Sequence, residues 1–255
     1  METSATTDEQ QQINDWIEAQ ELLKRRLILE DDFSWGLDVE KLRYVGGVDL
    51  SFSKDDPSIA CAALIVLDTI TLKVVYQDFS IVRLHIPYIP GFLAFREAPV
   101  LLELLQTMKC NTAAHHLYPQ LLMVDGNGFG LACHLGVLAD LPTIGIGKNL
   151  HHVDGLTQSG ARQSLKAQND CTKNLVILTG NSGNIWGAAM RSTECSLKPI
   201  YISTGHRISL NTAINVVKLL CKHRVPEPIR QADIRSREFL QKHPTVINSN
   251  LPVKR

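Results

Sequence analysis

The sequence has no excess charge of either sign, because 26 lysines and arginines balance 26 acidic residues. Proteins dedicated to binding nucleic acid usually carry an excess of positive charge. The balance therefore argues mildly against a dedicated DNA-binding protein, and it requires any contact with nucleic acid to come from local basic patches. It does not exclude an enzyme, and 255 residues are enough to bury a sizeable core.

Paired cysteines and long apolar segments are also lacking. The six cysteines form no Cys-x-x-Cys pair, and several lie in apolar runs where a reduced thiol packs well. No apolar run approaches the roughly 20 residues that cross a bilayer, and the polar, acidic start of the chain does not resemble a signal peptide. We therefore expect a reduced intracellular protein in the cytoplasm, the nucleus or both, the nucleolus included, without membrane contact. A monomer is expected as well, although no pattern in the sequence determines the oligomeric state.

The hydrophobic pattern predicts an α/β fold with a sheet of mixed direction. Three strands joined by short turns form an antiparallel meander, and a short buried strand follows after a helix, as in parallel sheets. Residues 154–173 have little pattern and read as a loop. The predicted elements are a helix over 13–28, strands over 44–52, 59–67 and 73–84, a helix after 97, strands over 120–124 and 141–148 around a helix at 129–138, strands over 175–178, 185–190 and 199–203, a helix capped by Ser209, and a helix over 229–241.

The domain organisation is simple, since we find neither an internal repeat nor a linker. Residues 1–11 are rich in threonine, glutamine and acids, a composition typical of disorder. Residues 12–242 are predicted to form a single domain. The end of the chain, 243–255, is predicted to be a loose tail.

The segment from Pro87 to Glu97 joins a Pro-Tyr-Ile-Pro sequence to a glycine and the start of a periodic helix. Its two prolines fix φ and bias the preceding residues toward extended backbone, so Tyr88 should lie on a stiff, projecting turn. Glu97 should lie near the N-terminus of the helix, where the helix dipole favours an ionised carboxylate. An equally simple interpretation is that Glu97 only caps the helix.

Two further acids lie in or after predicted strands. In the first strand, Gly47, Asp49 and Ser51 share one face. An acid in the middle of a strand is costly to bury unpaired, so either this face is solvated or a cation lies there. Asp125 directly follows the fourth strand, at the carboxyl edge of the predicted sheet.

Asp49, Glu97 and Asp125 are therefore candidates for a metal site. Magnesium is typically held by a few carboxylates together with phosphate oxygens of the substrate. Such an ion can activate water and stabilise the charge of an in-line displacement at phosphorus. The alternative is that the three are independent capping or surface acids.

Several motifs, in order, resemble those of the endonuclease V family over about residues 13–240. The motifs are Val45-Gly46-Gly47-Val48-Asp49, the segment from Pro87 to Glu97, Val124-Asp125-Gly126-Asn127-Gly128, His134-Leu135-Gly136-Val137, Gly145-Ile146-Gly147-Lys148, Ser203-Thr204-Gly205-His206-Arg207 and Pro226-Glu227-Pro228-Ile229-Arg230. The resemblance implies a ribonuclease H-like fold. It also implies Mg²⁺-dependent cleavage, with Mn²⁺ as a substitute, at the second phosphodiester 3′ to inosine, leaving 3′-hydroxyl and 5′-phosphate ends.

The resemblance assigns roles to individual residues. Asp49, Glu97 and Asp125 match the metal-binding acids of the family. Asp233 matches a fourth position, which the family fills with Asp or His and which the residues alone would place on a helix surface. Lys148 matches a lysine near the scissile phosphate, where a compact cation stabilises developing charge; on pattern alone it would be a solvated lysine.

The same resemblance places the substrate-binding residues. Tyr88 matches the wedge residue of the family, which fills the space left by a flipped base and offsets part of the unstacking cost. Its neighbours Pro87, Ile89 and Pro90 belong to the same substrate-binding segment. The backbone around the flipped base corresponds to Gly91, Leu93, Gly126 and Gly145.

One departure from the family lies after Gly128. The family usually has several more residues here, including a histidine and an arginine, before the equivalent of Phe129-Gly130. Either the protein has residues absent from this sequence, or it is a variant with impaired base binding or catalysis.

The leading hypothesis is an endonuclease for inosine-containing nucleic acid. Single-stranded RNA is the expected substrate, because the segments resemble animal members, and deaminated DNA is a further one. The alternatives are an inosine-binding protein that does not cut, and a scaffold without substrate.

Overall fold

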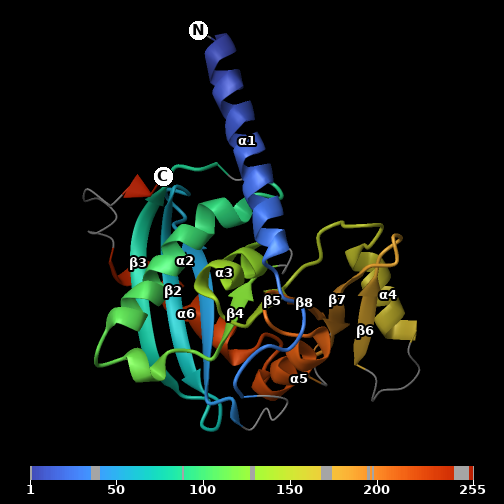
Figure 1. Cartoon of the computed structure of the whole chain (residues 1–255). Helices are drawn as coiled ribbons and strands as arrows, with labels where there is room; N and C mark the ends of the chain where they lie inside the picture. The colour runs from blue at the N-terminus through green and yellow to red at the C-terminus, as the bar shows by residue number, and fades with distance from the viewer. Residues whose placement is uncertain are drawn as a thin grey trace.

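The computed structural model of the chain describes residues 2–35, 41–87, 89–126, 130–167, 174–193, 196, 198–243 and 253–254. Within these residues, nine strands form one mixed sheet in the order β6-β7-β8-β5-β4-β1-β2-β3-β9 (Figure 1). The strands are β1 Tyr44–Phe52, β2 Ile59–Asp68, β3 Val74–Leu84, β4 Leu121–Asp125, β5 Thr143–Gly147, β6 Leu175–Thr179, β7 Ile185–Met190, β8 Ile200–Thr204 and β9 Val253–Lys254. The helices are α1 Glu2–Arg25, α2 Leu93–Cys110, the short 3-10 helix η2 His115–Leu117, α3 Leu131–Ala139, α4 Gln158–Ala167, α5 Leu210–Leu220 and α6 Glu227–Lys242.

The predicted strand directions are confirmed. β1, β2 and β3 form the antiparallel meander, and β4 runs parallel to both β1 and β5. The carboxyl ends of β1, β4 and β5 therefore lie at one edge of the sheet, called here the carboxyl edge. β8 is antiparallel to β5, and β7 is antiparallel to β8. The start of β8 and the end of β7 consequently lie at the carboxyl edge as well.

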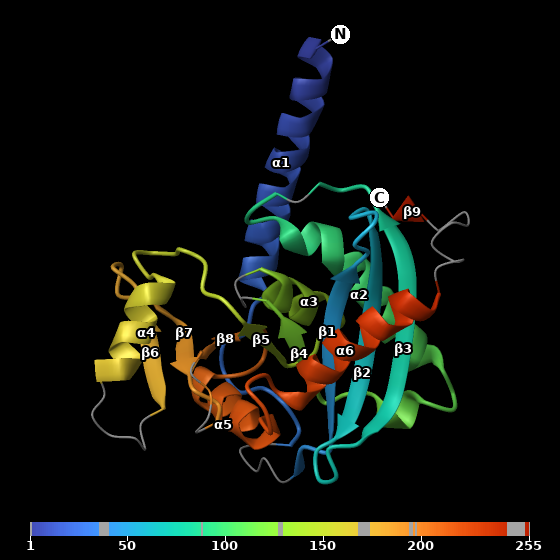
Figure 2. The ribbon, with the colours of Figure 1, turned by 180° about the vertical axis from the view of Figure 1, so that it is seen from behind.

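Helices cover both faces of the sheet, as predicted for this α/β fold (Figure 2). One face packs against α2 and α3, through a core that includes Val48, Leu64 and Val124. The other face packs against α5 and α6, through a core that includes Val45, Met123 and Ile202. α4 covers the β6–β8 end of the sheet, on the same side as α2 and α3, because Ala189 and Tyr201 alternate with their α5-facing neighbours.

The contact between β1 and α6 is made without an intervening side chain. A Cβ atom added to Gly47 would lie only 2.2 Å from the backbone oxygen of Pro228 on α6. Only glycine permits such an approach. Because side chains alternate along a strand, Asp49 and Ser51 face the same helix as Gly47.

Three segments differ from the sequence-based predictions. α1 begins at Glu2, so the predicted disorder of residues 1–11 is wrong for residues 2–11; side-chain pairs such as Gln11 to Asp15, at 2.8 Å, support this exposed part of the helix. Residues 158–167 form α4 instead of the predicted loop. The sequence pattern did not indicate this helix because only Ala161 and Leu165 are buried, and two residues are too few to give a recognisable apolar stripe.

The tail is also not wholly loose. Val253–Lys254 pair in parallel with the end of β3, whereas 244–252 lie outside the described residues. A helix long and apolar enough to cross a membrane does not occur in the part of the chain that the structure describes.

The β1–α6 contact generates a test of the fold. We expect Gly47→Ala to lower the free energy of unfolding by about 3 kcal/mol, because the added methyl group meets backbone, which cannot move aside as a side chain can. Gly130→Ala is the matched control, since a Cβ added there meets no atom within 4 Å among the residues that the structure describes. Urea unfolding of both variants measures the difference, and equal stabilities would contradict the close contact.

Candidate active site

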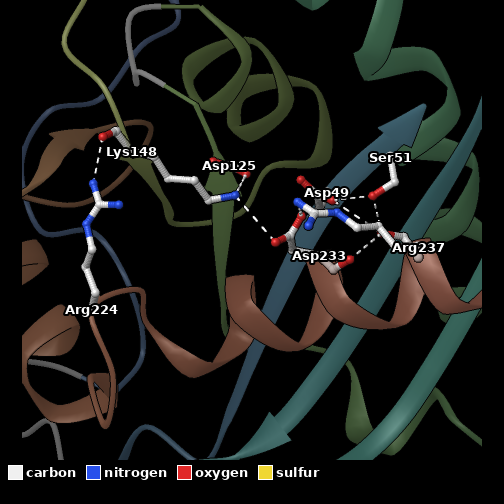
Figure 3. Close-up of polar contacts among 8 residues, drawn as sticks. Asp49, Ser51, Asp125, Lys148, Arg224, Asp233 and Arg237 are labelled. Carbon is white, nitrogen blue, oxygen red and sulfur yellow. Dashed lines mark hydrogen bonds and ion pairs between the residues drawn. The ribbon is translucent and has the colours of Figure 1, made fainter. Parts of the chain in front are cut away.

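Four of the predicted catalytic residues meet at the carboxyl edge (Figure 3). Asp49 lies on β1, Asp125 ends β4, Lys148 directly follows β5, and Asp233 lies on α6. Lys148 Nζ is 2.6 Å from Asp125 Oδ2 and 3.8 Å from Asp233 Oδ2. Lys148 thus joins two carboxylates that come from a strand and from a helix far along the chain.

Asp49 is the most deeply buried of these acids, with 7% of its surface exposed. Its Oδ2 accepts hydrogen bonds from Ser51 Oγ at 3.2 Å and from Ser236 Oγ at 3.3 Å. Burial, and next the charge of Asp125, raise the pKa of Asp49 to about 7, although Lys148 opposes the rise. The face of β1 that carries Asp49 is therefore not solvated: α6 covers it, and Lys148 supplies a nearby cation.

Glu97 lies one turn deeper in α2 than the sequence suggests. The helix begins at Leu93, its N-cap residue Phe92 makes no side-chain cap, and no acid lies in its first turn. Glu97 therefore lies near the N-terminus of α2, as predicted, but beyond its first turn, so the capping interpretation is excluded. Glu97 is buried, and its pKa is raised to about 7 by burial and next by the charges of Asp49 and Asp125, against Arg96. The carboxyl group of Glu97 therefore interacts electrostatically with Asp49 and Asp125.

Lys148 remains a cation in this setting. Burial alone would lower the pKa of Lys148, but the charges of Asp125, Asp233 and Asp49 outweigh it and raise that pKa. Arg224 anchors the lysine from behind, because its Nη2 donates to the backbone oxygen of Lys148 at 2.8 Å (Figure 3). Arg237 forms an ion pair with Asp233 on the side away from Lys148.

Three polar residues of the site were missed by sequence reasoning. Ser51 and Ser236 could have been found, since Ser51 alternates with Asp49 along the strand and Ser236 lies three residues after Asp233 on one helix face. No pattern in the sequence points to Arg224, which lies between α5 and α6.

The donor chemistry fits a magnesium ion. Carboxylate oxygens are the ligands that Mg²⁺ prefers. The pKa values of Asp49 and Glu97 are raised first by burial and then by the charges of neighbouring acids, and a divalent cation would offset this second contribution. No group of three acids, histidines or cysteines among the described residues is arranged closely enough to surround one ion. In this arrangement Lys148, rather than a third carboxylate, lies between Asp125 and Asp233.

The structure brings only some of the predicted base-binding residues to an open surface. Gly91 and Gly126 have φ angles of +89° and +128°, and a Cβ added to either meets no atom of the described residues within 4 Å, so both border open space in this part of the chain. The backbone oxygen of Gly91 accepts a hydrogen bond from Gln20 Nε2 of α1 at 2.8 Å. Gly145, by contrast, is buried in the middle of β5 between β4 and β8.

The remaining residues of this set surround the start of α2. Pro87 and Pro90 are exposed, whereas Ile89 and Leu93 are half-buried, and Leu93 is the first residue of the helix. Tyr88 lies outside the described residues, as do Asn127, Gly128 and Phe129, where the sequence is shorter than the family pattern. Trp16 of α1 stacks on Phe95, with ring centroids 5.2 Å apart, and thereby holds α1 against this end of α2.

Comparison with known proteins identifies relatives along nearly the whole chain. The family model for endonuclease V matches residues 21–234. Mouse endonuclease V is 44% identical over 248 residues, which cover 94% of this chain and 73% of the mouse protein. Human endonuclease V is 45% identical, with 89% of this chain and 83% of the human protein covered.

Solved structures agree with this result. The catalytic domain of human endonuclease V superimposes with a TM-score of 0.86 at 41% identity, covering 92% of this chain and 98% of that structure. Endonuclease V of Ciona intestinalis, in complex with a 23mer DNA containing an inosine followed by a ribo-adenosine, gives a TM-score of 0.84 at 36% identity, covering 91% and 98%.

The mixed sheet, with acids and a lysine at its carboxyl edge, is the framework of a nuclease, that is, a phosphodiester hydrolase. The chain belongs to the endonuclease V family. The α/β, ribonuclease H-like fold expected from the sequence is confirmed by these structures.

The burial of Asp49 generates a second test, in metal-free buffer containing EDTA. The pKa of Asp49 is raised from 3.8 to about 7 on folding, so the folded protein binds more protons than the unfolded protein between these pH values. Stability therefore falls as pH rises from about 4 to 7. Asp49→Asn cannot ionise, and we expect it to be more stable than the parent by about 2–4 kcal/mol at pH 8.

Urea unfolding at pH 4 and at pH 8 measures this effect, and the gain should largely disappear at pH 4. Glu18→Gln, an exposed position on α1, is the control and should change stability little at either pH. A destabilised Asp49→Asn variant at pH 8 would mean that the charged carboxylate stabilises the fold.

Proposed function

We propose that this protein cleaves inosine-containing nucleic acid, with single-stranded RNA preferred and deaminated DNA as a further substrate. The cleavage site is the second phosphodiester 3′ to inosine, and the products carry 3′-hydroxyl and 5′-phosphate ends. The observation that carries the proposal is the meeting of Asp49, Asp125, Asp233 and Lys148 at the carboxyl edge of a chain of this family. The Ciona protein bound to inosine-containing DNA supports the choice of base.

The RNA preference rests on resemblance to animal members of the family. The mouse and human relatives are 44% and 45% identical to this chain, whereas five bacterial members are 35–38% identical. The cytoplasm or nucleus as location, and a monomeric state, belong to the same proposal.

The acids of the site would hold Mg²⁺, or Mn²⁺ in its place, through Asp49, Glu97, Asp125 and Asp233. The ion, when bound, supplies a Lewis acid and a means of activating water. Ser51 and Ser236 orient Asp49 by donating to the same oxygen, Oδ2. Lys148 provides a fixed positive charge for the phosphate, because Asp125 and Asp233 hold its ammonium group and Arg224 holds its backbone.

The base would be held beside the start of α2. Gly91 and Gly126 carry no side chain and border open space among the described residues, so a flat ligand can approach their backbone, although Gly91 O already accepts from Gln20 and Gly126 N already donates to Ile146 O. Hypoxanthine presents a carbonyl and a protonated N1 where adenine presents an amino group and an acceptor. Backbone groups of fixed polarity at this place can therefore distinguish the two bases.

The assay that tests the proposal compares inosine-containing RNA, the same RNA with adenosine, and matched inosine-containing DNA, all in Mg²⁺. We expect cleavage of the inosine RNA only at the second phosphodiester, slower cleavage of the DNA, and none of the adenosine control. Asp125→Asn should lower kcat at least about a hundredfold, because it removes a ligand and the partner of Lys148. Glu18→Gln should cleave at the parental rate.

The shorter sequence after Gly128 gives a specific reason to keep the second candidate, an inosine-binding protein that does not cut. Inosine-dependent binding without cleavage in the same assay would favour that candidate. Absence of both binding and cleavage would leave the scaffold hypothesis.

Tyr88 generates a further prediction, taken from the sequence. Stacking of an aromatic ring against a base contributes roughly 1–3 kcal/mol, so we expect Tyr88→Ala to raise KM for inosine RNA about tenfold. Its melting temperature should stay close to that of the parent. A large fall in melting temperature would instead make Tyr88 a core residue.

A further inference from the structure

A basic pocket lies at the carboxyl edge beyond Lys148, on the side of β8 and β7. It has a volume of about 170 Å³ and is lined by Arg162, Leu165, Lys166, Arg191, Lys198 and Pro199. The cations come from three places: Arg162 and Lys166 from α4, Arg191 from the residue after β7, and Lys198 from the segment before β8. No sequence motif brings them together; the sheet does.

The pocket has a cationic surplus among the described residues. None of its four cations forms an ion pair with a described acid, whereas Arg43, Arg83, Arg207 and Arg230 all do. The nearest acids in sequence, Asp170 and Glu194, lie outside the described residues. In a chain without net charge, a concave group of cations of this kind is a local basic patch.

One of the four cations, Arg162, lies beside a buried side chain. The guanidinium of Arg162 approaches the hydroxyl of the buried Tyr201, whose pKa is raised by burial and lowered in part by Arg162. Neither Arg162 Nε nor Tyr201 Oη has a partner of good hydrogen-bond geometry among the described residues. The pocket therefore holds a fixed, incompletely satisfied guanidinium beside two exposed lysines, Lys166 and Lys198.

Arg224 connects this pocket to the active site. Its guanidinium donates to the backbone oxygens of Lys198 at 3.1 Å, Pro199 at 2.9 Å and Lys148 at 2.8 Å. The wall of the pocket and the backbone of Lys148 are thus held in one fixed relation. Neighbouring strands are about 4.8 Å apart, so the end of β7 lies about 14 Å along the edge from the end of β4. A nucleic-acid strand covers that distance within a few nucleotides.

We propose that the basic pocket binds backbone phosphate of the substrate strand on the 3′ side of the cleaved bond. The inference rests on the proposed function, and it extends the substrate contact beyond the base and the scissile phosphate. The direction follows from the order along the sheet: the open glycines, Gly91 and Gly126, lie on the α2 and β4 side of Lys148, and the pocket lies on the β8 and β7 side. A strand that is cut 3′ to its recognised base and continues past Lys148 reaches the pocket with its 3′ segment.

The test uses Lys166→Gln/Lys198→Gln in the full chain. Both lysines are exposed, so folding should be unaffected. The matched control is Lys73→Gln/Lys109→Gln, which removes the same charge from exposed positions before β3 and in the last turn of α2. The substrates are inosine RNAs shortened stepwise from the 3′ end, with a 5′-shortened series beside them, and each is cleaved at several salt concentrations.

For RNA with a long 3′ segment, we expect the pocket variant to raise KM about tenfold with kcat nearly unchanged. The slope of log(kcat/KM) against log[salt] should become shallower by about 1.4, at about 0.7 for each lost single-strand contact. RNA that ends just after the cleaved bond should be cut equally by the pocket variant, the control variant and the parent. An unchanged salt slope, or a dependence on 5′ rather than 3′ length, overturns the proposal.

A binding measurement separates this inference from the proposed function. Fluorescence anisotropy with inosine-free RNA in metal-free buffer should show the same loss of salt dependence in the pocket variant, even if no RNA is cleaved. The last measurement is the melting temperature of the parent and of the pocket variant, with and without inorganic phosphate. If the pocket variant loses stabilisation by inorganic phosphate while its RNA salt slope equals that of the parent, the pocket binds a free anion and the proposal is wrong.

Discussion

Repulsion among buried carboxylates is the constraint on which the active site depends. Asp49 and Glu97 are each less than a tenth exposed, and each lies in the field of the other acids. Burial of like charges costs free energy unless cations or hydrogen-bond donors compensate. Among the described residues, Lys148 compensates Asp125 and Asp233, Arg237 also pairs with Asp233, and two hydroxyl groups donate to Asp49.

The sheet explains why residues so far apart in sequence can share that edge. Parallel strands deliver their carboxyl ends to one side, which brings Asp125 and Lys148 together directly after β4 and β5. Antiparallel pairing brings the start of β8, with Lys198, and the end of β7, with Arg191, to the same side. One edge therefore carries first the acids and then the cations, an order that matches a phosphate backbone passing across it.

Much of this fold could be predicted from sequence, and the failures have physical causes. The meander, the parallel strand ending in Asp125 and the helix capped by Ser209 follow from alternation and from a cap whose hydroxyl accepts from the backbone nitrogen of Thr212 at 3.3 Å. α4 was missed because its buried stripe is two residues long. The N-terminal part of α1 was missed because its composition is polar, and helical hydrogen bonds do not depend on composition alone.

The candidate active site, like the fold, could be predicted only in part. Motif resemblance located Asp49, Asp125, Lys148 and Asp233 before the structure brought them together, but no residue pattern could place Glu97 in the second turn of α2 or find Arg224. Both depend on where helices begin and how loops pack, and sequence patterns determine such boundaries only to within a few residues. The basic pocket is beyond sequence patterns altogether, because its cations come from three separate segments.

The close approach of Gly47 to Pro228 has a consequence for motion. A backbone carbonyl has no rotamers, so β1 and α6 cannot slide or separate without breaking contact along the whole interface. Asp49 and Asp233, carried by these two elements, therefore move as parts of one rigid body. Any change in the spacing of the acids during a catalytic cycle must therefore fall to Asp125, at the end of β4, accompanied by the side chain of Lys148, whose backbone Arg224 holds in place.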